Sequence, residues 1–230
     1  MHSISVITLA YNEDGNLERV VHNTLEILEA IATEYEVIIV DDGSTDCTAE
    51  IADRLAAGSL HVRVVHHERN KGIGAGMNTG HKHAQYELIS YAVGDGQIPP
   101  SSIVSFLEVI DSTDVALGMF RERADSRVRK FMSFVWRDVF TRLMFGPIPL
   151  ADGNYMFRRG LVQDISLVST TGVSTIELFY RFHKKGCRFQ EVTVECLPRI
   201  SGESKVANWR YILRTLWEMV QLRVALFRGN

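Results

Sequence analysis

Polar and acidic side chains follow two apolar runs near the start of the chain. The runs, Ile4–Leu9 and Val37–Val40, are rich in β-branched residues and predict two buried strands. Open α/β sheets bind their ligands in the crevice beyond the carboxyl ends of the strands. A ring that can stack on a base, and polar groups that suit a ribose, follow at Tyr11, Asn12, Glu13, Asp41 and Asp42. These residues predict a nucleotide site, and turn formation or a helix N-terminus is the alternative explanation.

A glycine-rich segment, residues 70–80, follows the third predicted strand and opens a helix. A dinucleotide fingerprint needs a glycine where Met77 stands, and it normally follows the first strand. We therefore exclude a nicotinamide site. Lys71 is suited to neutralise a phosphate, and a solvated lysine is an equal alternative.

The elements that position these residues alternate in type through the first half of the chain. Strands are predicted at Ile4–Leu9, Val37–Val40, Val62–Val65 and Tyr86–Val93, and helices at Asn16–Ile31, Thr45–Leu55 and Ile73–Ala84. Ser44 or Thr45 is expected to cap the second helix. This alternation predicts a Rossmann-like α/β fold with a mostly parallel, doubly wound sheet flanked by helices.

The second half is less regular. It predicts a strand at Val115–Met119, another at Phe189–Leu197, and helices at Ile103–Ile110, Arg127–Phe145, Gly172–Lys185 and Ala207–Phe227. We expect one domain over residues 1–205 and a C-terminal amphipathic helix in residues 206–230.

Together these segments resemble the family 2 glycosyltransferases, which have the GT-A fold. In that family the first strand typically ends in Tyr-Asn-Glu and the second in Asp-Asp-Gly-Ser, as they do here. The resemblance covers about residues 3–205. It implies that Asp41 contacts the nucleobase of a sugar nucleotide, with Asp42 beside it, and that Tyr11, Glu13 and Lys71 belong to the same donor site.

The resemblance also implies a divalent cation, Mg²⁺ or Mn²⁺, on the donor diphosphate. The family usually has Asp-Gly-Asp-Gly-Gln or Asp-Ala-Asp-Leu-Gln where this chain has Val93-Gly94-Asp95-Gly96-Gln97. Asp95 and Gln97 match, but Val93 replaces the first acid. Because hard cations prefer several oxygen ligands, we expect a weakened site that diphosphate and water oxygens complete. A metal-free enzyme that relies on Arg or Lys, or one with reduced activity, are the alternatives.

Two further residues are assigned by resemblance. Arg121 follows the fifth predicted strand, where family members that act on polyprenyl phosphates carry an Arg, and a planar guanidinium suits phosphate recognition. Asp152 is the candidate base for an acceptor hydroxyl. A phosphate acceptor is already ionised, in which case Asp152 has only a structural role.

The most specific subclass signal is the stretch Arg199-Ile200-Ser201-Gly202-Glu203-Ser204-Lys205. It resembles dolichol-phosphate mannose synthase and related polyprenyl-phosphate glycosyltransferases, in which basic residues line the donor and acceptor phosphates. The resemblance assigns Arg199, Ser204 and Lys205 to phosphate binding.

Charge is spread unevenly. The net charge is −3, but residues 199–230 carry six Lys or Arg against two Glu. This basic tail predicts an anionic partner, and no nucleic-acid motif accompanies it. Its last helix has apolar residues bordered by arginines, as do helices that lie in a lipid interface; packing on the domain or in a dimer is the alternative.

We find no apolar run long enough for a transmembrane helix and no signal segment. The three cysteines are odd in number and lack metal-type spacing, so reduced thiols are expected. We therefore expect a protein on the cytoplasmic face of a membrane, attached peripherally or through a membrane partner protein.

The expected reaction is inverting transfer of a sugar from a UDP- or GDP-sugar to a polyprenyl phosphate. One alternative is transfer to a saccharide hydroxyl in surface polysaccharide synthesis. The other is a non-catalytic partner subunit that binds nucleotide or lipid, which the replacement at Val93 suggests.

Overall fold

The computed structural model describes residues 2–93, 98–120, 140–196 and 209–227. The strands are β1 His2–Ala10, β2 Ala32–Asp41, β3 Val62–His66, β4 Leu88–Val93, β5 Val115–Phe120, β6 Tyr155–Arg158 and β7 Phe189–Val194. The helices are α1 Leu17–Ile31, α2 Thr48–Gly58, α3 Ile73–His83, α4 Ser102–Leu107, α6 Thr141–Phe145, α7 Val173–Lys184 and α8 Trp209–Phe227, with a 3₁₀ turn, η2, at Arg159–Val162.

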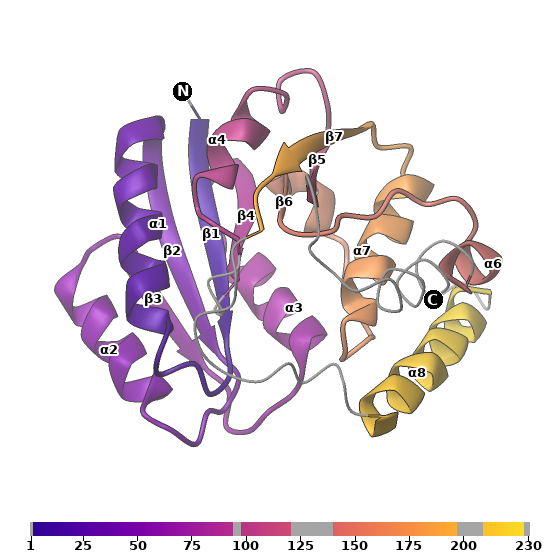
Figure 1. Ribbon diagram of the computed structural model, residues 1–230, viewed down its shortest axis with the longest axis horizontal. Helices are drawn as coiled ribbons and strands as arrows, with labels where there is room; N and C mark the ends of the chain where they lie inside the picture. Colours follow the sequence, from indigo (N-terminus) through magenta and orange to yellow (C-terminus); the bar gives the residue numbers. More distant parts are fainter. Residues whose placement is uncertain (1, 94–97, 121–139, 197–208, 228–230) are drawn as a thin grey trace.

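The described strands form one sheet in the order β3-β2-β1-β4-β6-β5-β7 (Figure 1). Every pairing is parallel except those of β6, which runs antiparallel to β4 and β5. The carboxyl ends of six strands therefore lie at one edge of the sheet, and the start of β6 lies at that same edge. The predicted mostly parallel sheet with flanking helices is confirmed.

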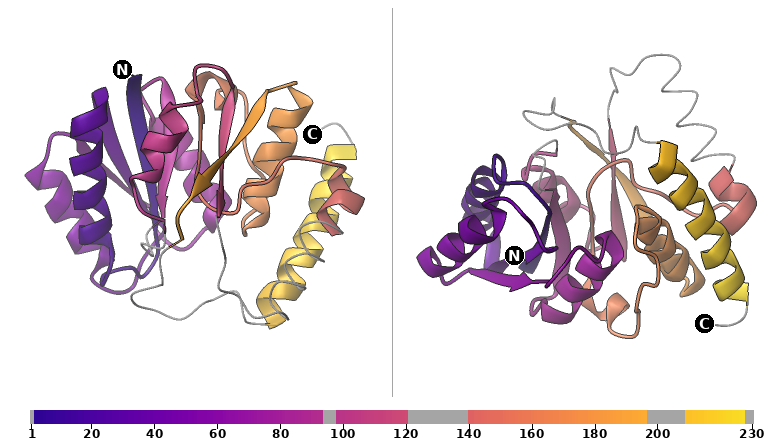
Figure 2. Two further views of the ribbon diagram at one scale, coloured as in Figure 1. Left: turned by 45° about the horizontal axis from the view of Figure 1, so that its top comes forward. Right: turned by 90° about the horizontal axis from the view of Figure 1, so that it is seen from below.

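Alternation along the central strands creates a core on each face of the sheet. In β2, Val37 and Ile39 pack with α1 and α2, whereas Ile38 and Val40 pack on the other face with Met77 of α3. All four are fully buried, as expected for strands of a parallel sheet that helices cover on both sides. Figure 2 shows the sheet and its helices in two further views, the second of them from below.

The last helix, α8, lies beside α6 and α7 at the end of the molecule far from α1 and α2 (Figure 1). Its Met219 and Leu222 are buried in a cluster with Phe145, Val173 and Ile176. Its packing on the domain is therefore part of the fold, and the division at residue 205 stays a prediction.

Three details differ from the sequence predictions. Strand β6 was not predicted, because a four-residue segment is defined by its two neighbours rather than by its own pattern. Helix α2 begins at Thr48, so neither Ser44 nor Thr45 caps it. Of the long helix predicted at Arg127–Phe145, the described part contains only α6, and residues 127–139 lie outside the described residues.

Candidate active site

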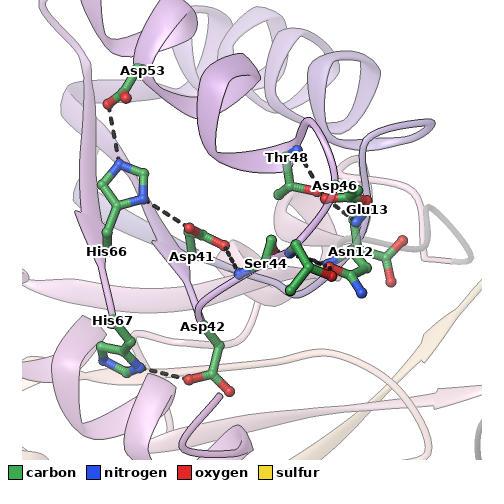
Figure 3. Close-up of polar contacts among 11 residues, drawn as sticks. Asn12, Glu13, Asp41, Asp42, Ser44, Asp46, Thr48, Asp53, His66 and His67 are labelled. Atoms are coloured by element: carbon green, nitrogen blue, oxygen red, sulfur yellow. Dashed lines mark hydrogen bonds and ion pairs between the residues drawn. The ribbon is translucent and has the colours of Figure 1, made fainter. Parts of the chain in front are cut away.

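Asp41 ends β2 with its carboxylate buried and held from two sides. The Nδ1 atom of His66 lies 2.8 Å from Oδ2, and the backbone N–H of Ser44 donates to Oδ1 at 3.0 Å (Figure 3). The other ring nitrogen of His66 lies 3.2 Å from Asp53 Oδ1. The hydrogen bond to Asp41 raises the pKa of His66 above its ordinary value, although partial burial acts in the opposite direction. The carboxylate is therefore fixed in orientation before any ligand binds.

Asp42 takes a different set of partners. One oxygen accepts from the backbone N–H of Lys71 at 2.9 Å and faces Nδ1 of His67 at 2.7 Å. The other accepts from the backbone N–H of Gly72 at 2.8 Å. The adjacent acids thus point in different directions, as Figure 3 shows, and Asp42 anchors the segment that enters α3.

The segment after β1 lies against the segment after β2. Asn12, in the left-handed region at φ 55°, donates its backbone N–H to Ser44 Oγ at 3.0 Å and accepts from the N–H of Thr45 at 2.9 Å. The backbone N–H of Glu13 donates to Oγ1 of Thr48 at 2.8 Å. Ser44 and Thr45 therefore join the two strand ends instead of capping α2.

Asp152 precedes β6 at the same edge of the sheet. Its backbone N–H donates to the carbonyl of Gly118 in β5 at 2.9 Å, and Asp152 as a whole is half-buried. In the sheet order, β2 and β6 are separated by β1 and β4. At about 4.8 Å per strand, the Asp41 and Asp152 positions are about 14 Å apart along the edge.

The histidines that hold the two acids were not predicted as site residues. A usable signal was present, because His66 and His67 follow the third apolar run as Asp41 and Asp42 follow the second. The parallel register then sets Asp41 opposite His66.

The other predicted site residues form two groups, those that the structure describes and those that lie outside the described residues. Tyr11 is half-buried at the end of β1, and the Lys71 side chain is exposed. Asp95, Gln97, Arg121, Arg199, Ser204 and Lys205 lie outside the described residues. Within the described ranges, no three His, Cys, Asp or Glu side chains gather into a group that could hold a metal.

Whether the chain suits a divalent cation depends on the residues that follow β4. That strand pairs with β1 and ends at Val93, so the chain leaves it at the edge where Tyr11 and Asp41 lie. Asp95 and Gln97 supply oxygen atoms, the ligand type that Mg²⁺ and Mn²⁺ accept. Their chemistry fits a cation, and two such residues leave most of its coordination to other groups.

The fold and this edge define a glycosyltransferase of the GT-A class. The chain belongs to glycosyl transferase family 2, whose family model matches residues 5–166. The resemblance seen in the sequence and the expected enzyme class are therefore confirmed.

Two relatives share the name undecaprenyl-phosphate 4-deoxy-4-formamido-L-arabinose transferase. The one from Edwardsiella ictaluri is 28% identical over 246 residues, which cover 99% of this chain and 71% of the relative. The one from Enterobacter sp. is 27% identical over 219 residues, which cover 92% of this chain and 65% of the relative. The chain thus spans about two thirds of these relatives.

Solved structures of glucosyl-3-phosphoglycerate synthase from Mycobacterium tuberculosis share the fold. The complex with phosphoglyceric acid has a TM-score of 0.71 at 19% identity, covering 96% of this chain and 80% of that one. The complex with Mn²⁺, UDP-glucose and glycerol 3-phosphate has a TM-score of 0.70 at 20% identity, with the same coverage. These likenesses establish the GT-A architecture.

Proposed function

We propose that this protein transfers a sugar from a UDP- or GDP-sugar to a polyprenyl phosphate, with inversion at the anomeric carbon. The observation that carries the proposal is the common edge of the sheet, where Asp41, Asp42 and Asp152 meet the ends of β1 and β4. The acceptor class is supported by the two relatives named for undecaprenyl phosphate and by the Arg199–Lys205 stretch.

In the proposed complex the nucleobase lies at Asp41 and the sugar lies toward Asp152. A phosphate oxygen of the acceptor attacks the anomeric carbon as the bond to the donor diphosphate breaks. The acceptor oxygen is already ionised, so no base is required. Arg121, Arg199 and Lys205 are proposed to offset the phosphate charges, because cationic groups stabilise negative charge that develops on the leaving group.

Asp95 and Gln97 would hold Mg²⁺ or Mn²⁺. When bound, the cation would neutralise charge on the donor diphosphate. The replacement at Val93 makes this site depend on the nucleotide for additional oxygen ligands.

We further propose that the protein acts at the cytoplasmic face of a membrane, attached through α8. Four apolar side chains on α8, Leu213, Trp217, Val220 and Val224, are exposed. Below, these four residues are called the α8 stripe. No helix in the described ranges has both the length and the apolar character needed to cross a bilayer.

Calorimetry with the full chain tests donor binding. UDP or GDP should bind, and Asp41→Ala should weaken binding at least tenfold, which is about 1.4 kcal/mol. Asp53→Ala, which removes the exposed carboxylate on the far side of His66, is the matched control. If neither nucleotide binds the wild-type protein, the proposed function is wrong.

A second acceptor class is favoured by the position of Asp152. Its backbone is fixed to β5 at the edge where an acceptor would enter, as a base for a saccharide hydroxyl requires. Asp152→Asn decides between the two acceptors. Transfer to a polyprenyl phosphate should persist, whereas transfer to a hydroxyl should fall by about a hundredfold or more.

A further inference from the structure

The loop Leu167–Gly172, called here the 167–172 loop, is held by two carboxylates from different helices. Glu177 of α7 is fully buried and accepts from the backbone N–H groups of Val168 at 3.1 Å and Ser169 at 3.0 Å. Glu218 of α8 accepts from the next two residues through both their backbone N–H groups and their hydroxyls. Four successive amides of the loop are thus anchored by acids.

Glu218 is a strong anchor for this loop. Its hydrogen bonds to Thr170 Oγ1 and Thr171 N are 2.8 and 3.0 Å long. Burial opposes ionisation, but the hydrogen bonds from Thr171 and Thr170 lower the pKa of Glu218. An ionised acceptor makes shorter and stronger hydrogen bonds than a neutral one. The carboxylate is therefore a charged link between α8 and the loop.

The other side of the loop lies directly on the start of α3. A Cβ atom on Gly72 would lie 2.3 Å from the carbonyl oxygen of Thr170, and one on Gly74 would lie 1.8 Å from that of Ser169. Further along α3, the Asn78 amide both donates to and accepts from the backbone of Leu167, at 2.8 and 2.9 Å. Only glycine at these two positions permits this approach of the two backbones.

Gly72 also connects the loop to the candidate active site. Its backbone N–H donates to Asp42, one residue from Asp41. A continuous series of contacts therefore leads from Glu218 through Thr170 and Gly72 to Asp42. All of these contacts lie between segments far apart in sequence.

We infer that Glu218 is a positioning residue for the donor site, acting through the 167–172 loop on the start of α3. The inference rests on the proposed function, because it assigns the nucleotide to the edge that carries Asp41 and Asp42. It makes α8 a support of that site as well as a surface helix. Without the Glu218 carboxylate, Glu177 still holds the first half of the loop. The half that contacts Gly72 loses its four hydrogen bonds to Glu218 and keeps those from Arg214 to Thr170 Oγ1, at 3.1 Å, and from Ser174 to the Thr171 carbonyl.

Two variants test the inference with the full chain. Glu218→Gln keeps the size of the side chain but removes its charge and places an N–H₂ group among donors. Gln221→Ala, at an exposed position on the same helix, is the control. Nucleotide affinity, measured by calorimetry with UDP and GDP well below the melting temperature, should fall about tenfold in Glu218→Gln, the scale of one lost hydrogen bond to a charged group. The control should stay within about twofold of wild type.

Hydrogen exchange gives a second measurement that needs no ligand. In Glu218→Gln, the amides of Gly72 and Gly76 should exchange faster, because they mark the start of α3. Thr170→Val removes one hydroxyl partner of Glu218 and the acceptor of the Arg214 hydrogen bond. It should weaken nucleotide binding less than Glu218→Gln does, and the two effects should not add.

The outcomes separate this inference from the proposed function. A lower melting temperature in Glu218→Gln with unchanged nucleotide affinity and unchanged exchange at α3 would overturn the inference, since Glu218 would then only attach α8. If the wild-type protein binds no nucleotide, the proposed function fails, and exchange at Gly72 still decides whether Glu218 orders α3. If Asp41→Ala weakens binding and Glu218→Gln does not, the inference alone fails.

Discussion

His66 Nδ1 lies 2.8 Å from Asp41 Oδ2, and the two residues are direct partners across the parallel pair β3 and β2. The second carboxylate oxygen, Oδ1, accepts a hydrogen bond from the backbone N–H of Ser44. A carboxylate has about four lone-pair positions, so Asp41 retains acceptor capacity for one more donor, which in the proposed complex is a nucleobase N–H. The imidazole and the amide fix its plane, which reduces the ordering that ligand binding would otherwise require.

The Asp41–His66 pair predicts a pH dependence of stability. Because the hydrogen bond to Asp41 raises the pKa of His66, its stabilising contribution is complete below the unfolded value of about 6.5 and is lost as pH rises through the higher folded value. His66 is partly exposed, so the contribution should be below about 1 kcal/mol. Urea unfolding between pH 6 and 9 should show this loss in wild type and not in His66→Gln. An NMR titration of the His66 ring with a midpoint at or below 6.5 would contradict the prediction.

His81 predicts a pH dependence of the opposite sign. Burial lowers the pKa of His81 from 6.5 to about 4, and its Nε2 atom is hydrogen-bonded to Tyr91. Between these values the unfolded chain binds a proton that the folded protein excludes, so stability should fall as pH drops from 6.5 toward 4. The loss should approach about 3 kcal/mol. Unfolding free energies for His81→Gln should be flatter over this range, and His22→Gln, at an exposed position, should follow wild type.

The glycines of α3 predict unequal effects of alanine. Gly74→Ala would set a Cβ atom 1.8 Å from the Ser169 carbonyl oxygen, and we expect a loss of about 1–3 kcal/mol in unfolding free energy. Gly58→Ala is the matched control, since no atom lies within 4 Å of its Cβ position at the end of α2. It should be neutral or stabilising by up to about 1 kcal/mol. Equal melting temperatures for the two variants would show that the 167–172 loop is not in close contact with α3.

Local pattern predicted the strand ends but not what surrounds them. The apolar run before Asp41 and Asp42 predicted β2 and the place where it ends. A strand that is buried on both faces has a continuous apolar sequence, so its end is visible where the polar residues begin. The histidines that hold these acids come from the next strand, and only the register between strands aligns them. Strand β6 has four residues and takes its conformation from β4 and β5, so no signal within it was sufficient.

The last helix shows a second limit of sequence reasoning. The sequence predicts a single apolar side for this helix, bordered by arginines. In the fold, Met219 and Leu222 face the domain, while Leu213 and Trp217 face outward. Composition alone does not tell which apolar side a helix buries, because the choice depends on packing against α6 and α7.

The segment from Val93, at the end of β4, to Gln97 predicts a cation affinity that one substitution can raise. Val93→Asp would restore the acid that family members usually carry, giving a second carboxylate near Asp95 in sequence. Mn²⁺ affinity in the presence of UDP or GDP should increase about tenfold, or 1.4 kcal/mol. Val93→Asn, which adds polarity without charge, should change it less. Tight Mn²⁺ binding by wild type without nucleotide would contradict the weakened site.

The α8 stripe predicts binding to anionic vesicles. At about 100° per residue, its four side chains fall on one line, opposite the buried Met219 and Leu222. Arg214 and Arg223 lie about 90° to either side of that line, and both are exposed. The one carboxylate in α8, Glu218, is turned to the 167–172 loop. An exposed side that is apolar at its centre and basic at its margins matches an anionic lipid surface.

Replacing two stripe residues together, Leu213→Ser with Trp217→Ser, should reduce co-sedimentation with vesicles containing anionic lipid by about tenfold or more, since each buried side chain contributes about 1.5–3 kcal/mol. Arg223→Gln alone should have a smaller effect, because one basic residue near such a surface contributes about 1 kcal/mol. Leu60→Ser is the control for exposed apolar residues, as Leu60 is fully exposed between α2 and β3. Raising the salt concentration should weaken the arginine contribution and leave the apolar one. If the wild-type protein does not bind anionic vesicles at low salt, the α8 stripe does not contact a membrane. A saccharide hydroxyl then becomes the better candidate for the acceptor.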